Sequence, residues 1–164
     1  MKKKDTNLYY DYLGDKLKPF VEAEFNRKNR FIITYPKELG LDEWVTYSST
    51  PIELQLPNET MLSGIHDPLA PEVTVYSDLV IEVQDPVSPS SAQKVMKFMK
   101  DEWKSKEPRR LVYLYKNLAP TGEVTRTSEV LAFIKSVDFG SLDYDSDELL
   151  RIKLTLGVDH VRLV

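Results

Sequence analysis

The sequence of 164 residues contains no cysteine, and this absence removes several kinds of chemistry. Disulfide bonds, thiolate metal sites and cysteine nucleophiles are all excluded, so packing and hydrogen bonds alone must stabilise the fold. The six glycines stand singly and form no phosphate-binding loop, and no serine occupies the Gly-x-Ser-x-Gly pattern of a hydrolase. We therefore expect no enzyme activity and no cofactor. Carboxylates brought together by folding are the route to catalysis that the sequence leaves open.

Long apolar runs are also missing. No segment approaches the roughly 20 consecutive apolar residues that a membrane span requires, and a balance of 41% apolar and 29% charged residues predicts a water-soluble protein. The basic start at residues 1–5 is not followed by the apolar core of a signal peptide, because Asp11 and Asp15 interrupt the stretch. We expect an intracellular chain of one domain, large enough to bury a core and without a membrane partner.

Metal ligands are scarce as well. The two histidines, His66 and His160, have no acidic or histidine neighbour at metal-ligand spacing. Residues 143–147 place carboxylates at the first, third and fifth positions of a calcium-loop pattern, but Glu148 and Leu154 occupy the positions that require glycine and glutamate. We interpret this segment as a solvated turn and predict no metal site.

Alternating segments predict a chain built mainly of β-strands. A strand with one buried face is expected within residues 44–56, where Ile52, Leu54 and Leu56 alternate with polar side chains. The closing segment at 149–164 alternates in the same way until its phase changes beside Gly157, which indicates a β-bulge. Residues 57–71 form a long excursion, and loops of this length are more often functional than idle. Further strands are expected at 30–35, at 72–84 with a bend at residues 76–78, at 110–115 and at 123–137, followed by a loop rich in acidic residues at 138–148.

One segment, from about Ser88 to Lys104, has the signals of a helix. Ser90 is a suitable N-cap, and Gln93 three residues later is a capping-box partner. Apolar side chains then recur at helical spacing, whereas lysines lie off that stripe. We predict that the helix packs on the sheet through this stripe. Its expected core contacts are Val95, Met96, Met99 and Trp103.

Several segments, in their order and spacing, are similar to those of a known family. They are residues 29–33, 78–85 leading into the helix, 114–117 before the turn at Gly122, and the C-terminal runs 137–139, 142–146 and 154–159. From about residue 29 onward the chain resembles the tail-tube proteins of contractile-tailed bacteriophages. None of these segments is catalytic, so the resemblance points to a structural protein.

The resemblance implies a mainly β (α+β) fold, in which two packed antiparallel sheets form a β-barrel-like sandwich with one flanking helix. It divides the chain into an N-terminal arm or short helix at 1–28 and a tail-tube β domain at 29–164. It also implies stacked hexameric rings, in which hairpins from each subunit close one large barrel and remove exposed sheet edges. The implied partners are copies of itself, tail sheath and baseplate proteins, in a virion tail made in the host bacterial cytoplasm.

A tube of this kind passes DNA through its lumen during ejection. The net charge is −4, so six copies would carry −24 and repel phosphates, which suits a conduit. Strand alternation places Ile52, Leu54 and Val124 toward the core and their polar neighbours away from it. The candidate lumen-facing residues are Glu53, Gln55, Glu59, Glu123, Thr125 and Thr127.

Other interpretations share part of this evidence. A baseplate tube-initiator or a tube-cap protein would have the same fold but stop at one ring instead of stacking. Secreted injection tubes of bacteria are a further relative. A small ligand-binding β-barrel would instead be a closed monomer, with an apolar cavity and convergent polar groups.

Overall fold

The computed structural model describes residues 25–55 and 75–164. The expected excursion at 57–71, most of the expected arm at 1–28 and the lumen candidate Glu59 therefore lie outside the described residues. In chain order the described elements are β1 Phe31–Thr34, the 3-10 helix η1 Glu43–Val45, β2 Thr46–Ser49, β3 Leu54–Gln55, β4 Val75–Tyr76, β5 Leu79–Gln84, α3 Ser91–Glu102, β6 Leu111–Leu118, β7 Val124–Asp138 and β8 Arg151–Leu163.

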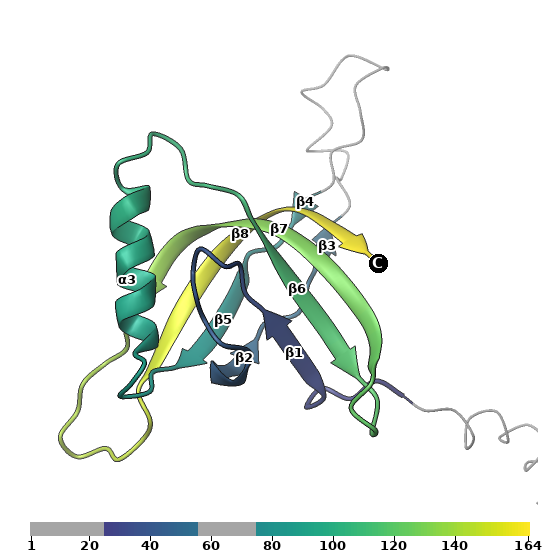
Figure 1. Ribbon diagram of the computed structural model, residues 1–164, viewed down its shortest axis with the longest axis horizontal. Helices are drawn as coiled ribbons and strands as arrows, with labels where there is room; N and C mark the ends of the chain where they lie inside the picture. The colour runs from purple at the N-terminus through teal and green to yellow at the C-terminus, as the bar shows by residue number, and fades with distance from the viewer. Residues whose placement is uncertain (1–24, 56–74) are drawn as a thin grey trace, which may run out of the picture.

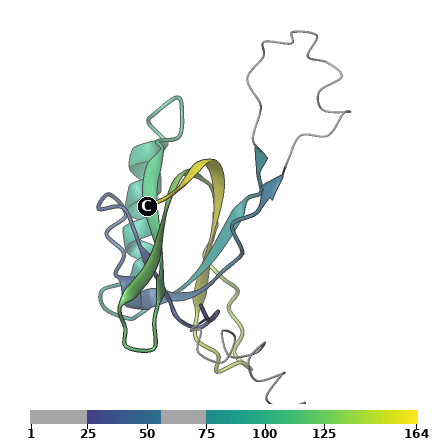
Figure 2. The same cartoon turned by 90° about the vertical axis from the view of Figure 1, so that its right-hand side faces the viewer.

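Six strands form one antiparallel sheet in the order β1-β6-β7-β8-β5-β2. The sheet curls into a barrel that is nearly closed, and α3 flanks it on one side (Figure 1). β3 and β4 form a separate two-stranded ribbon that projects from the barrel (Figure 2). The predicted β-rich class with a flanking helix is confirmed. The two expected sheets are, within the described residues, one curled sheet and one short ribbon.

The core follows from alternation on the central strands. On β5, Leu79, Ile81 and Val83 are buried and the residues between them are half-buried, and β8 likewise buries every second residue from Ile152 to Leu156. The register pairs Leu79 with Leu156 and Val83 with Ile152, so the two buried rows share one interior. Because one face of each strand is apolar, curling the sheet around this interior removes that face from water.

The two edge strands do not pair, and side-chain hydrogen bonds span the seam between them. Thr46 at the start of β2 shares a hydrogen bond of 2.6 Å with the hydroxyl of Tyr35, which follows β1. Ser49 at the end of β2 shares one of 3.0 Å with the hydroxyl of Tyr115 on β6, the neighbour of β1. These contacts connect the two edges without a backbone ladder, and the barrel is therefore not fully closed.

The long strands β7 and β8 pair with two irregularities. Their ladder skips Asp159 on β8 and Lys135 on β7. The first irregularity lies just beyond Gly157 and confirms the β-bulge predicted from the change of phase. The buried row of β8 ends there, and Asp159 and His160 are exposed.

The helix begins where the sequence predicts. Ser90 is the N-cap: its hydroxyl accepts the Gln93 N–H at 3.3 Å and donates to Oδ1 of Asp85 at 2.9 Å. The same Asp85 oxygen accepts the N–H of Ala92 at 3.2 Å. A carboxylate therefore stabilises the positive end of the helix dipole and ties the helix to the residue that follows β5.

Candidate assembly surfaces

α3 has two neighbouring apolar stripes, and the barrel buries the first but only part of the second. Val95 and Phe98 on the first stripe are 1% and 5% exposed. The second stripe consists of Ala92, Met96, Met99 and Trp103. It lies roughly 100° further round the helix, because each residue advances about 100°. Met99 packs against the core, but Met96 is 41% exposed and Trp103 is 87% exposed.

This arrangement corrects the prediction that Met96 and Trp103 are core contacts. Helical spacing identifies an apolar arc, but it does not decide which part of a wide arc meets the sheet. Phe98, which the predicted stripe omits, occupies the interior beside Val95. With Val95 and Phe98 buried, Met96 and Trp103 are left on the more exposed side of the helix.

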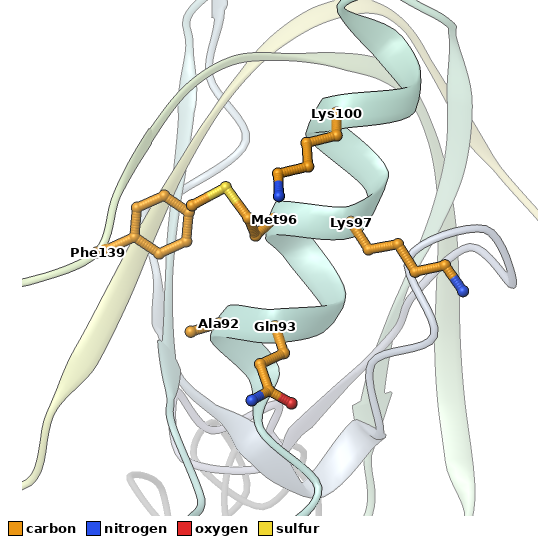
Figure 3. Close-up of a pocket in the computed structure, with 6 residues that line it drawn as sticks. All are labelled: Ala92, Gln93, Met96, Lys97, Lys100 and Phe139. Carbon is orange, nitrogen blue, oxygen red and sulfur yellow. The ribbon is translucent and has the colours of Figure 1, made fainter.

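The outward stripe borders two grooves between α3 and the end of β7. One groove, of about 420 Å³, is lined by Ala92, Gln93, Met96, Lys97, Lys100 and Phe139. Figure 3 shows Met96 extended toward the ring of Phe139, while Lys97 points away on the other side of the helix. The second groove, of about 470 Å³, lies nearer the C-terminal end of α3, and its lining includes Met99, Trp103, Lys106, Pro108, Arg109 and Val137.

The lumen candidates that the structure describes lie in two places. Glu53 and Gln55 are exposed at β3. Glu123 and Thr125 are exposed at the hairpin between β6 and β7, and Thr127 is half-buried further along β7. Figure 1 and Figure 2 both show the ribbon and this hairpin at opposite ends of the barrel. A single subunit therefore does not bring the two groups together.

Their apolar neighbours do not all reach the core. Ile52 packs against it, but Leu54 is 54% exposed and Val124 is 52% exposed, contrary to the prediction. Both residues lie where a strand extends past the core, so alternation sets their face without burying them. The ladder with β6 skips Thr125, and this irregularity separates Val124 from the alternating stretch that buries Ser128 and Val130. Thr127 lies beyond this irregularity and alternates with the buried Ser128, which places it on the face turned away from the core.

The seam contains three tyrosines whose hydroxyls differ in their surroundings. Burial raises the pKa of Tyr115 to about 12, and it also raises the pKa values of Tyr35 and Tyr113 well above the ordinary range. The ring of Tyr113 meets that of Tyr35 edge-on, with 6.3 Å between centroids. Among the described residues, the buried Tyr113 hydroxyl has no hydrogen-bond partner. The seam is thus a low-dielectric region that disfavours charge.

A cluster on the outer face of the barrel was not predicted. Phe133 is opposite Gly157 in the register, and a Cβ atom on that glycine would lie 2.5 Å from Phe133 Cζ. Arg110 stacks its guanidinium over the same ring, 4.7 Å from the centroid, and forms an ion pair of 2.8 Å with Asp159. The signal available in the sequence was Gly157 itself, because a single glycine inside an alternating strand often marks a place where another group approaches the backbone closely.

The described residues contain neither a cluster of metal ligands nor a helix that could span a membrane. Across residues 25–55 and 75–164, no three histidine, aspartate or glutamate side chains gather closely enough to hold a metal ion. In this same part of the chain, no helix has the length and apolar character needed to cross a bilayer. Residues 143–147 are exposed, and Asp143 accepts the N–H of Asp145 at 3.0 Å, which is the geometry of a solvated turn.

A nearly closed six-stranded barrel, a projecting ribbon and one flanking helix together define a class of fold. The chain has the fold of the tube, terminator and cap proteins of contractile injection systems, and the predicted resemblance is confirmed at the level of the fold. No family model matches the sequence, and no curated protein matches it significantly.

Three solved structures illustrate this similarity. A chain of the extended-state sheath/tube terminator of PVC, an extracellular contractile injection system, has a TM-score of 0.59 and 14% identity, covering 87% of this chain and 99% of that one. A chain of the extended PVC sheath-tube complex has a TM-score of 0.56 and 16% identity over 90% of this chain and 95% of that one. A chain of the tube-terminating cap of the anti-feeding prophage has a TM-score of 0.56 and 15% identity, covering 87% of this chain and 92% of that one.

Proposed function

We propose that this chain is a structural subunit of a phage tail tube, and that it forms stacked hexameric rings whose lumen conducts DNA during ejection. The observation that carries the proposal is the extent of the fold match, which reaches 95% and 99% of the length of the sheath-tube and terminator chains. The likeness therefore spans nearly the whole of those chains. In this role the chain is not an enzyme, and its partners are its own copies, the sheath and the baseplate of a virion tail.

Unpaired strand edges support assembly with other copies. β1 and β2 are the edges of the main sheet, and the β3–β4 ribbon has two strands. Exposed edges favour pairing with a further chain, and a two-stranded ribbon is marginally stable by itself. The edges of the main sheet already meet through side chains, so the projecting ribbon is the part that a ring would cover, and this is the physical reason to favour an oligomer over a monomer.

The lumen in this proposal is lined by polar side chains that the core does not use, among them Glu53 and Glu123. Both are exposed carboxylates, and each subunit has a net charge of −4. A wall of like charge repels phosphates, so that DNA passes without being retained.

Charge reversal in the lumen tests this assignment. Tubes in which Glu53 and Glu123 are both changed to lysine should still assemble, because no core contact is altered, but they should retain DNA at low salt and release it as salt rises. Glu38→Lys combined with Asp101→Lys is the matched control, since it changes the net charge equally on two exposed residues, one in α3 and one next to it. Intact lumen-variant tubes that bind no more DNA than the control would refute the assignment.

The comparisons favour a second candidate function. Terminator and cap chains are among the structures with this fold. A main tube subunit stacks without limit, whereas a terminator, cap or tube-initiator forms one ring. Electron microscopy of the purified chain separates the two: tubes of variable length support the tube subunit, single rings support the terminator or cap, and a monomer at all concentrations would contradict both.

A further inference from the structure

The C-terminal end of α3 is basic as well as apolar. The groove of about 470 Å³ beside Trp103 is bordered by Lys106 and by Arg109, whose guanidinium pairs at 2.9 Å with Glu102 of the same groove. Residues 91–110 hold seven lysines and arginines against three carboxylates. Within the described part of the chain, Lys104 and Lys106 form no ion pair. We refer to this surface as the basic groove.

The connection between β7 and β8 has the opposite charge. Residues 139–150 hold four carboxylates and no cation. Three large apolar side chains project from it into solvent: Leu142 is 88% exposed, Leu149 is 66% exposed and Tyr144 is entirely exposed. A cluster of exposed apolar side chains between charges is typical of an interaction surface. We refer to residues 142–149 as the acidic loop.

The basic groove and the acidic loop lie toward opposite ends of α3. Figure 1 and Figure 2 both place the segment that follows α3 at one end of the helix and the acidic loop beyond the other end. The acidic loop of a subunit therefore lies away from its own basic groove. A second copy displaced along the axis of α3 would bring its acidic loop next to the basic groove of the first copy.

We propose that the acidic loop of one copy docks in the basic groove of the next copy, with Tyr144 beside Trp103 and the loop carboxylates facing Lys104 and Lys106. A second copy is the occupant because the two surfaces are complementary in charge and both are apolar, within one sequence. The contact is heterologous, so each bound pair leaves one free loop and one free groove, and copies join in series. The inference rests on the proposed function, because it supplies the contact by which one ring stacks on another.

Cysteine cross-linking tests the contact directly, because the natural chain has no cysteine. Tyr144→Cys and Trp103→Cys chains are mixed under mild oxidation and separated on a non-reducing gel. Mixed dimers should form in preference to either self-pair, since a disulfide requires Cα atoms within about 7 Å. The control mixes Tyr144→Cys with Val124→Cys, whose cysteine is also exposed but lies on the hairpin between β6 and β7. Control dimers or self-pairs in equal yield would overturn the proposal.

Charge reversal provides a second measurement. A loop variant changes Asp143, Asp145 and Asp147 to lysine, and a groove variant changes Lys104 and Lys106 to glutamate. Each variant alone should sediment as single rings instead of tubes, and a mixture of the two should recover tubes, because each reversed loop then meets a reversed groove. If the loop variant and the groove variant each form tubes as the wild-type chain does, the docking contact alone is overturned. A wild-type chain that forms neither rings nor tubes would instead overturn the proposed function.

Discussion

Removing one oxygen atom from the core should stabilise the subunit. Tyr113 on β6 is fully buried, and among the described residues its hydroxyl has no hydrogen-bond partner. A buried hydroxyl without a partner costs about 1–3 kcal/mol. Phenylalanine keeps the ring and its edge-on contact with Tyr35. We therefore expect Tyr113→Phe to raise the free energy of unfolding by about 1–2 kcal/mol.

Two neighbouring tyrosines are matched controls. Tyr115→Phe and Tyr35→Phe remove the same atom, but their hydroxyls are bonded to Ser49 at 3.0 Å and to Thr46 at 2.6 Å. Each change should lower the free energy of unfolding by about 0.5–1.5 kcal/mol, because it breaks a hydrogen bond and leaves the partner hydroxyl behind. The three variants thus differ mainly in whether the lost hydroxyl has a partner.

Urea denaturation followed by circular dichroism measures these differences. Dilute protein keeps assembly from adding to the apparent stability, and an unchanged m-value would show that each variant exposes the same surface on unfolding. A Tyr113→Phe chain that is less stable than wild type by 1 kcal/mol would refute the reasoning, because it would reveal a hydrogen bond to that hydroxyl in the folded subunit.

Three other changes test the seam, the outer face and the helix. Burial raises the pKa of Tyr115 from 10.0 to about 12. The neutral Tyr115 side chain therefore contributes fully to the free energy of unfolding below pH 10, and this contribution should fall by about 1.4 kcal/mol per pH unit between pH 10 and 12. A urea midpoint that does not change with pH in that range would contradict this. Gly157→Ala should lower the free energy of unfolding by about 1–3 kcal/mol, because the new Cβ would lie 2.5 Å from Phe133 Cζ. If the same change is equally destabilising in a chain that already carries Phe133→Ala, this clash is excluded as the cause. Met99→Asp should abolish soluble folding, because it would place an unpaired charge where the Met99 side chain now packs against the core. Trp103→Asp on the exposed side should fold normally, and a soluble Met99→Asp chain would show that the boundary of the core is misplaced.

Much of the local structure could be predicted because it depends on residues close together in the chain. The cap at Ser90 requires only the N–H of Gln93, and the observed hydrogen bond confirms it. The predicted bend within 72–84 divides β4 from β5, and the phase change beside Gly157 marks the bulge. The segment 44–56, expected to be one strand, contains two, β2 and β3, and the polar residues Thr46–Ser49 of β2 gave no signal of this division.

The sequence by itself determined the β-rich class, the single amphipathic helix of the described residues and the position of the bulge, since periodicity and capping act over a few residues. Tertiary structure alone decided which stripe of α3 is buried, because Val95 and Phe98 compete with Met96 and Trp103 for one sheet surface. It also decided that the edges of the sheet meet through side chains and that the basic groove and acidic loop lie toward opposite ends of α3. These features depend on segments distant in sequence, whose relative placement is set by packing around the whole barrel and not by any local pattern.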